Sequence, residues 1–276
     1  MKIGFVGAGA VGRALGIHFK EEVVGYYSRT PEHAREAAER IGATFYADFS
    51  DLIRDASLIM LTVNDDAIEA VAREIADRDL PLEGKVFAHT SGVHSSESLN
   101  ALKAKGAKTM SLHPLHAFAD PERPIGAIVF GIEGDITEAI KSWLVRYGFD
   151  PVEMATDQKI RYHLAAAVAS NYLDATVDFA VRQLEIVGFS NEVARKALWP
   201  LILGTVENIE HLGTVKALTG PIARGDAGTI EKHLSQLSGE DREFYCVMGK
   251  WALKMASEKG LDDEKYVTLS NILKEA

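Results

Sequence analysis

The stretch KIGFVGAGAVGRALG, residues 2–16, decides how the first half of the chain is interpreted. Its apolar start is typical of a strand, and the glycine pattern G-x-G-x-x-G follows it and opens a helical pattern over 11–20. Gly7 allows a tight turn, Gly9 lets a pyrophosphate approach the backbone, and Gly12 lets the helix pack closely on the strand. The helix N-terminus then offers free N–H groups to the phosphates. The expected dinucleotide contacts in this loop are Gly7, Gly9, Ala10, Val11 and Gly12.

Short apolar runs alternate with amphipathic segments throughout the first half of the chain. Strands that alternate with helices form right-handed crossovers and a mostly parallel sheet covered on both faces, so we expect a doubly wound α/β domain. The expected strands are 2–6, 23–27, 58–63, 85–88, 107–111, 126–132 and a short one near 151–154. The expected helices are 11–20, 31–41, 66–77, 95–105 and 135–147, the last capped by Asp135.

The alternation stops after about residue 155. From Asp157 to Val187 the sequence reads as one long helix, which Gly188 ends. Further helices are expected at 191–211, 229–237, 240–258 and 262–275. We therefore predict a Rossmann domain over 1–155 and an all-α domain over 156–276, with a cleft between them.

The residues after the strand at 23–27 bear on the choice of cofactor. A carboxylate there would bind the 2′-hydroxyl of NAD and repel a 2′-phosphate, but this chain has Ser28, Arg29 and Thr30. Arg29 can stack on the adenine and pair with the phosphate, while Ser28 and Thr30 can donate hydrogen bonds. Alternatively, the segment only caps the helix that Pro31 begins, with Thr30 as the N-cap. Both can hold at once, and the sequence favours NADP over NAD.

Polar residues follow two further strands at the carboxyl edge, where such sheets bind ligands. Asn64 and Asp65 could reach a ribose hydroxyl, although an Asp here could simply cap the next helix. Ser91 with Gly92 could place a hydroxyl and a backbone N–H near a nicotinamide ring, or form a plain turn with Ser95 as the next cap. The expected cofactor contacts here are Val63, Asn64, Asp65 and Ser91, and Ser91 is also a catalytic candidate.

Two histidines follow the strand at 107–111. His113 precedes Pro114, and His116 lies beyond it. A histidine in an extended X-Pro conformation is often structural, so a place for His113 in the substrate site is one of two open interpretations. Without carboxylate or cysteine partners the two histidines do not predict a metal site.

Polar residues recur on one face of the long helix at three- and four-residue spacing. Reduction of a carbonyl needs a proton donor or cation for the developing alkoxide, and groups that hold the substrate. His163 fits the first role. Asn171, about 12 Å further along the helix axis, fits the second. The alternative is that His163 packs between the domains and Asn171 satisfies backbone groups there. The polar residues of this face are Lys159, His163, Ser170, Asn171 and Asp174.

The segment ALTGPIARGDAGT, residues 217–229, interrupts the helical pattern with three glycines and a proline. Arg224 could bind a substrate carboxylate, and Thr219 and Gly220 could offer a hydroxyl and a backbone N–H. The alternative is a connector in which Arg224 pairs with Asp226 while Asp226 caps the next helix.

Four motifs together resemble a known family. They are HTSG at 89–92, SLHPLHAFAD at 111–120, YHLAAAVASNYL at 162–173 and LTGPIARGD at 218–226. The family has a Rossmann-like N-terminal domain and a C-terminal domain catalogued as of unknown function, and the resemblance covers nearly the whole chain. More distantly, the architecture is similar to the 6-phosphogluconate dehydrogenase-like reductases, which include pyrroline-5-carboxylate reductase, β-hydroxyacid dehydrogenases and ketopantoate reductase.

In that superfamily the long helix often carries a catalytic Lys-x-x-x-Asn pair. Here His163 and Ala167 stand where such a pair would fall. Either His163 replaces the lysine as the acid, or Lys159 reaches in, or the chemistry differs. The resemblance implies an NADP-dependent oxidoreductase and a homodimer packed through the helical domains. It favours a small carboxylate-bearing carbonyl or imine as substrate, with 2-oxo acids such as ketopantoate preferred.

Two other functions stay open at this stage. The missing lysine allows a non-catalytic NADPH-binding redox sensor or regulatory protein. Deazaflavin in place of nicotinamide is disfavoured, because Arg29 has a clear partner in a 2′-phosphate.

The composition limits the classes of molecule that the chain is expected to bind. The chain has 276 residues, 47% of them hydrophobic and 25% charged, as in soluble globular proteins. Its net charge of −10, without a run of Lys and Arg, argues against nucleic acid. No apolar stretch reaches the roughly 18–20 residues that span a bilayer. The first residues read directly as a strand, so no secretion signal is expected. The single cysteine, Cys246, excludes an intrachain disulfide. We expect a cytoplasmic protein that binds a small-molecule substrate, without nucleic acid, membrane or metal.

Overall fold

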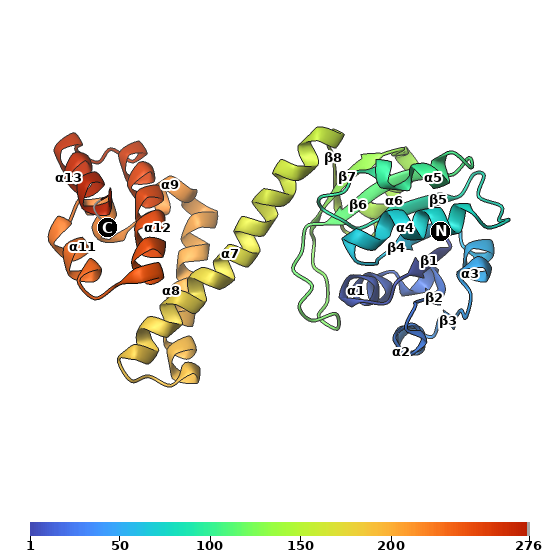
Figure 1. Ribbon diagram of the computed structural model, residues 1–276, viewed down its shortest axis with the longest axis horizontal. Helices are drawn as coiled ribbons and strands as arrows, with labels where there is room; N and C mark the ends of the chain where they lie inside the picture. Colours follow the sequence, from blue (N-terminus) through green and yellow to red (C-terminus); the bar gives the residue numbers. More distant parts are fainter. Residues whose placement is uncertain (275–276) are drawn as a thin grey trace. The chain divides into compact units, whose positions relative to one another are not determined.

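The computed structural model describes residues 1–274 and divides into two compact units, Met1–Tyr172 and a unit that begins at Leu173. The division falls inside the long helix α7 (Lys159–Ile186), coloured yellow in Figure 1. The boundary predicted from the sequence lies before this helix, between 155 and 156. The first turns of α7, up to Tyr172, therefore belong to the N-terminal unit.

The N-terminal unit contains an eight-stranded sheet of order β3-β2-β1-β4-β5-β6-β7-β8. Neighbouring strands are parallel except for β6 and β7, which pair antiparallel. This confirms the predicted doubly wound, mostly parallel α/β domain. The strands are β1 (Ile3–Val6), β2 (Val23–Tyr27), β3 (Thr44–Phe45), β4 (Leu58–Leu61), β5 (Val86–His89), β6 (Lys108–Pro114), β7 (Val129–Gly134) and β8 (Asp150–Glu153).

Helices cover both faces of this sheet. Strand β4 shows why, since all four of its residues are buried: Leu58 and Met60 join one apolar cluster, while Ile59 and Leu61 join the other. A strand buried on both faces lies at the centre of a layered sheet. The first cluster packs on α1 (Ala10–His18), α2 (Pro31–Ile41) and α6 (Glu138–Arg146), and the second on α3 (Phe49–Asp55), α4 (Ile68–Ala76) and α5 (Asn100–Lys103). Short 3₁₀ turns are η1 (Lys20–Glu22), η2 (Asp65–Ala67), η3 (Ser96–Leu99) and η4 (Thr156–Gln158).

Several local features differ from the sequence-based predictions. Strand β3 and helix α3 were not predicted, and the helix expected at 95–105 consists of η3 followed by α5. Asp135 does not cap α6; Thr137 does, with its hydroxyl accepting from Ile140 N. Asp135 instead accepts hydrogen bonds from Lys103 Nζ at 2.8 Å and Thr109 N at 3.1 Å, because its own backbone N–H is tied to β6.

The C-terminal unit is all-helical, as predicted. Its core is formed by buried side chains of α11, α12 and α13, among them Leu234, Leu253, Leu269 and the single cysteine, Cys246. The helices after α7 are α8 (Asn191–Leu212), α9 (Thr214–Ala217), α10 (Gly220–Arg224), α11 (Ala227–Leu234), α12 (Gly239–Glu258) and α13 (Asp263–Lys274). Residue 275 of the range expected for the last helix lies outside the described residues. Within residues 1–274, every helix is too short or too polar to cross a bilayer.

Candidate active site

The glycine loop between β1 and α1 has the geometry that a pyrophosphate requires. Gly7 has φ +110°, and a Cβ there would collide with the carbonyl oxygen of Thr62. A Cβ on Gly12 would lie 2.8 Å from Gly7 O, so these two glycines allow tight packing. Gly9 is exposed, and a Cβ placed there would meet no atom within 4 Å. The loop is therefore packed from behind and open in front, at the N-terminus of α1.

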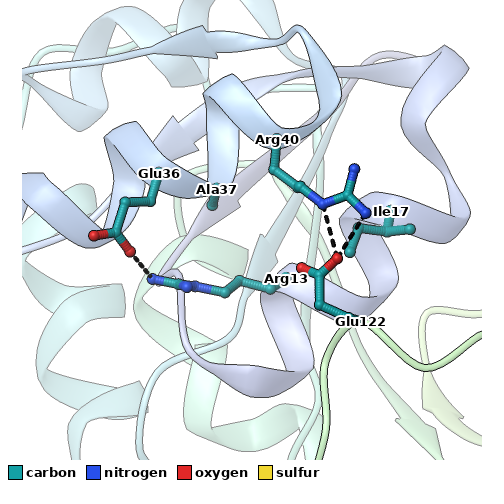
Figure 2. Close-up of a pocket in the computed structure, with 6 residues that line it drawn as sticks. All are labelled: Arg13, Ile17, Glu36, Ala37, Arg40 and Glu122. Atoms are coloured by element: carbon teal, nitrogen blue, oxygen red, sulfur yellow. Dashed lines mark hydrogen bonds and ion pairs between the residues drawn. The ribbon is translucent and has the colours of Figure 1, made fainter.

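Arg13 of α1 links the glycine loop to helix α2. Its Nε donates to Ala8 O at 3.0 Å, and its guanidinium donates to Glu36 at 2.9 Å (Figure 2). A pocket of about 200 Å³ lies here, lined by Arg13, Ile17, Glu36, Ala37, Arg40 and Glu122. Both of its arginines are paired with glutamates, so its charges already have partners.

In the segment after β2, Arg29 and Thr30 are exposed and Ser28 is half-buried. Thr30 occupies the N-cap position of α2, with Pro31 as the first helical residue, but its hydroxyl accepts no hydrogen bond from the helix. Ser28 Oγ accepts from Thr30 N at 3.3 Å, which keeps its own hydrogen free to donate. Arg29 is exposed and forms no ion pair within the described residues. Side-chain capping therefore does not account for these residues.

The loops after β4 and β5 are joined through the hydroxyl of Ser91. It donates to Asp65 Oδ2 at 2.8 Å and accepts from the backbone N–H groups of Val93 and His94 at 3.2 and 3.1 Å. Because this hydroxyl is already fully hydrogen-bonded, Ser91 orders the loop rather than offering a free group. Asn64 is exposed beside Asp65, and the backbone N of Val63 lies next to the glycine loop.

The capping alternatives for these two loops have different outcomes. Neither Asp65 nor Asp66 caps α4, which has Ala67 at its N-cap. Ser95 does occupy the N-cap position of η3, but its side chain accepts no hydrogen bond from that turn. Buried His89, which the sequence analysis did not single out, orders the second loop. Its Nδ1 accepts from the backbone N–H of Ser91, and its Nε2 donates to Ser95 O at 3.0 Å. This pattern needs a neutral ring, and burial lowers the pKa of His89 to about 4.

Lys159, the first residue of α7, lies buried beside the end of β5 and the middle of β6. Its side chain is 1% exposed, and its Nζ donates to Ser111 Oγ at 2.7 Å and to Ser91 O at 3.2 Å. An ammonium has three donors, and the third has no acceptor within residues 1–274. Burial lowers the pKa of Lys159 to about 8, although the charges of Glu133 and Asp65 raise it in part.

Two histidines meet the same loop at Gly92. A Cβ on Gly92 would collide with His163 Nδ1 and lie 2.9 Å from His113 Nε2, so only glycine lets both rings approach. His113 Nδ1 is hydrogen-bonded to Tyr162 OH at 2.9 Å. Burial, with the nearby charge of Lys159, lowers the pKa of His113 to about 4. His163 Nδ1 is buried without a hydrogen-bond partner in the described chain.

The structure thus gathers Ser91, His113 and His163 from the predicted set and adds Lys159, which the sequence offered only as an alternative. Lys159 and His163 are four residues apart on α7, so they lie about one helical turn apart. That spacing was the available signal. His116 lies apart from this group in the exposed loop after β6.

The remaining predicted residues lie elsewhere. Asn171 is exposed, about two turns beyond His163 on α7. Thr219, Gly220 and Arg224 belong to the C-terminal unit, where Gly220 begins α10 with φ +89°. Asp226 does cap α11, by accepting from the backbone N–H and the hydroxyl of Thr229, but no ion pair joins it to Arg224 within the described residues. The described residues also contain no group of three or more His, Cys, Asp or Glu that could hold a metal.

Two family models match the chain: a Rossmann-like domain over residues 1–114, and a domain of unknown function, DUF2520, over residues 128–252. No curated protein matches the chain.

Solved structures share the fold over nearly the whole chain. A candidate NADP oxidoreductase from Bacteroides fragilis is 23% identical, with TM-score 0.73, over 93% of this chain and 96% of that one. A Thermotoga maritima protein is 26% identical, with TM-score 0.70, over 93% and 99%. Pyrroline carboxylate reductase from Plasmodium falciparum, solved with NADP bound, is 16% identical, with TM-score 0.66, over 98% of each chain. The Rossmann-like and DUF2520 models thus match successive parts of the chain, in the order that its motifs predicted.

Proposed function

We propose that this chain is an NADP-dependent oxidoreductase that reduces a small carbonyl or imine compound carrying a carboxylate. One observation carries the proposal: a buried ammonium with a free N–H, Lys159, lies at the sheet edge that also holds the open glycine loop. A hydride donor and a proton donor are the two parts that such a reduction needs. Two similarly folded proteins support this: the one from Bacteroides fragilis is a candidate NADP oxidoreductase, and the pyrroline carboxylate reductase from Plasmodium falciparum was solved with NADP bound.

The glycine loop and the segment after β2 would hold the cofactor. The N-terminus of α1 offers backbone N–H groups to the pyrophosphate, and exposed Arg29 offers its guanidinium to a 2′-phosphate. When bound, NADPH supplies a hydride. The residues proposed to contact it are Gly7, Gly9, Ala10, Val11, Gly12, Ser28, Arg29, Thr30, Val63, Asn64, Asp65 and Ser91.

Lys159 is the group we propose as proton donor. With a pKa of about 8 it is mostly protonated at neutral pH and still releases its proton readily. Of the two acids that the sequence left open, His163 and Lys159, we take Lys159, which lies one helical turn before His163. The unpartnered Nδ1 of His163 then serves to hold a polar group of the substrate. The redox-sensor alternative was based on the absence of a catalytic lysine, and in this proposal Lys159 takes that role.

The substrate class rests on the family resemblance, and 2-oxo acids such as ketopantoate are the first to test. The residues proposed to bind substrate are His113, Asn171, Thr219, Gly220 and Arg224. Arg224 has an exposed guanidinium that suits a carboxylate.

The test is NADPH oxidation with a panel of 2-oxo acids and cyclic imines. Lys159→Met should lower kcat about a hundredfold or more while leaving the Kd for NADPH unchanged. Lys85→Met is the matched control, because Lys85 is a half-buried lysine that, like Lys159, donates to a backbone carbonyl, here Ala56 O, but at the amino ends of the strands. Full activity of Lys159→Met would overturn the assignment. Tight NADPH binding without turnover on any substrate would instead favour the sensor.

Arg29 tests the cofactor preference separately. Arg29→Ala should weaken NADPH binding about tenfold and leave NADH binding unchanged, because a charged hydrogen bond contributes about 1.5–3 kcal/mol. Equal loss for both cofactors would contradict a role with the 2′-phosphate.

We also propose that a second copy of the chain covers helix α8. Many of its large apolar side chains are exposed, with Leu201 at 67% and Trp199 at 57%. An exposed apolar surface of this kind marks an interface in a folded protein. Sedimentation should give a dimer, and Trp199→Glu with Leu203→Glu should give monomers. A monomeric wild-type protein at micromolar concentration would contradict the proposal.

A further inference from the structure

Glu133 on β7 is a buried carboxylate with no part yet in the proposed chemistry. Its side chain is 5% exposed. It accepts hydrogen bonds from Ser96 N at 2.7 Å, from Ser96 Oγ at 2.9 Å and from Thr156 Oγ1 at 2.9 Å. A buried carboxylate is costly unless hydrogen bonds or an opposite charge compensate it, so a position of this kind has a specific reason.

Glu133 shares one face of the sheet with the groups that hold Lys159. In the antiparallel β6–β7 pair, Glu133 is directly opposite Ser111. Side chains of opposite residues leave the same face, with Cβ atoms about 4.5–5.5 Å apart. Lys159 donates to the hydroxyl of Ser111. The Lys159 ammonium therefore lies on the same face of the sheet as the carboxylate of Glu133. They form no direct ion pair within residues 1–274, but the carboxylate raises the pKa of Lys159 against the effect of burial.

Glu133 also joins two separate segments of the chain. Through Ser96 it binds η3, just after the loop whose carbonyl at Ser91 accepts from Lys159. Through Thr156 it binds η4, which leads directly into α7 and Lys159. One carboxylate thus holds both the lysine and one of its acceptors in register.

We propose that Glu133 is a positioning residue for Lys159, which fastens the start of α7 to the loop after β5 and supplies the buried negative charge that favours the ammonium. The inference rests on the proposed role of Lys159 as proton donor. Other groups also act on this lysine. Asp65 is an exposed carboxylate, so solvent screens it more strongly than Glu133. The titratable groups around Lys159 are Asp65 of η2, His89 of β5, His113 of β6, Glu133 of β7 and His163 of α7.

The charge effect can be measured without substrate or cofactor. In protein labelled with ¹³C-lysine, the Cε resonance of Lys159 is assigned by its loss in Lys159→Met and followed against pH. Glu133→Gln should lower the pKa of Lys159 by about one unit, a tenfold change in proton affinity. Asp135→Asn is the matched control, since Asp135 is a half-exposed carboxylate just beyond β7 that binds Lys103 instead. It should leave the titration of Lys159 unchanged.

The positioning effect needs a variant that keeps the charge. Thr156→Val removes the bond between Glu133 and η4. It should leave the pKa of Lys159 unchanged, lower kcat several-fold and leave KM for NADPH unchanged. If Thr156→Val has wild-type kcat, the fastening role is wrong.

Two results would overturn the charge role: an unchanged Lys159 titration in folded Glu133→Gln, or an equal change in Asp135→Asn. Should Glu133→Gln not fold, wild-type protein labelled with ¹³C-glutamate decides the matter. The Cδ resonance of Glu133 should then show a step near the pKa of Lys159 that is lost in Lys159→Met, and its absence would refute the coupling. Failure to reduce any substrate would refute the proposed function alone, because both titrations are made on the free protein.

Discussion

The ammonium of Lys159 should cost the folded protein stability at neutral pH. Burial lowers its pKa from 10.5 to about 8. A difference of one pKa unit between the folded and unfolded chain corresponds to about 1.36 kcal/mol, so the cost is about 3 kcal/mol. Below pH 8 the lysine is charged in both the folded and the unfolded chain, and the full cost is present. Above pH 10.5 it is neutral in both, and the cost is gone. Between these values the unfolded chain binds more protons, so stability attributable to this group rises with pH.

The assay is urea unfolding of wild type and Lys159→Met at pH 7 and pH 10.5. Wild type should gain most of about 3 kcal/mol relative to the variant between the two pH values. Comparing the two pH values cancels the packing that methionine changes. Lys85, whose pKa burial also lowers, is present in both proteins and cancels as well. The same difference in unfolding free energy at both pH values would refute the reasoning.

Other substitutions test the loop and the buried histidine. Arg13→Ala should weaken NADPH binding about fivefold, because a bond to Ala8 O of about 1 kcal/mol holds the glycine loop; an unchanged Kd in a fluorescence titration would exclude this support. Gly9→Ala should keep the melting temperature of the free protein, whereas Gly7→Ala, at φ +110° against a backbone oxygen, should lower it, and identical melting curves would contradict the packing argument. Wild type should lose stability as the pH falls from 6.5 to 4, because His89 takes up a proton at higher pH in the unfolded chain than in the folded one. In urea unfolding over that range, His89→Gln should lose about 3 kcal/mol less than wild type. An equal loss in both proteins would show that His89 is not the cause.

Much of the architecture could be predicted because its signals are local. The apolar run, the three glycines and the helical pattern after them all lie within residues 2–16, and each acts through its neighbours in the chain. Strand β2 and helix α2 have the predicted bounds for the same reason. Strand β3, with two residues, and α3, with seven, are too short to show a period, so they were missed.

The candidate site depended on contacts that no local pattern contains. A lysine is expected to be exposed, yet Lys159 is buried because the loop after β5 and a hydroxyl on β6 close around it. From the sequence, Ser91 could offer a free hydroxyl, but in the structure this hydroxyl is hydrogen-bonded to three groups from two loops. Asp135 had the spacing of a cap, but β6 holds it elsewhere.

The Rossmann fold, the all-helical second half and the proposed cofactor class can be predicted from local patterns, because periodicity and glycine spacing act over a few neighbouring residues. Which polar groups are buried, paired or free depends instead on the folded chain. Lys159, Ser111 and Glu133 lie far apart in the chain, and the sheet and the start of α7 bring them together. Burial and hydrogen-bond satisfaction depend on every segment that packs around a group, so they exist only in the folded chain.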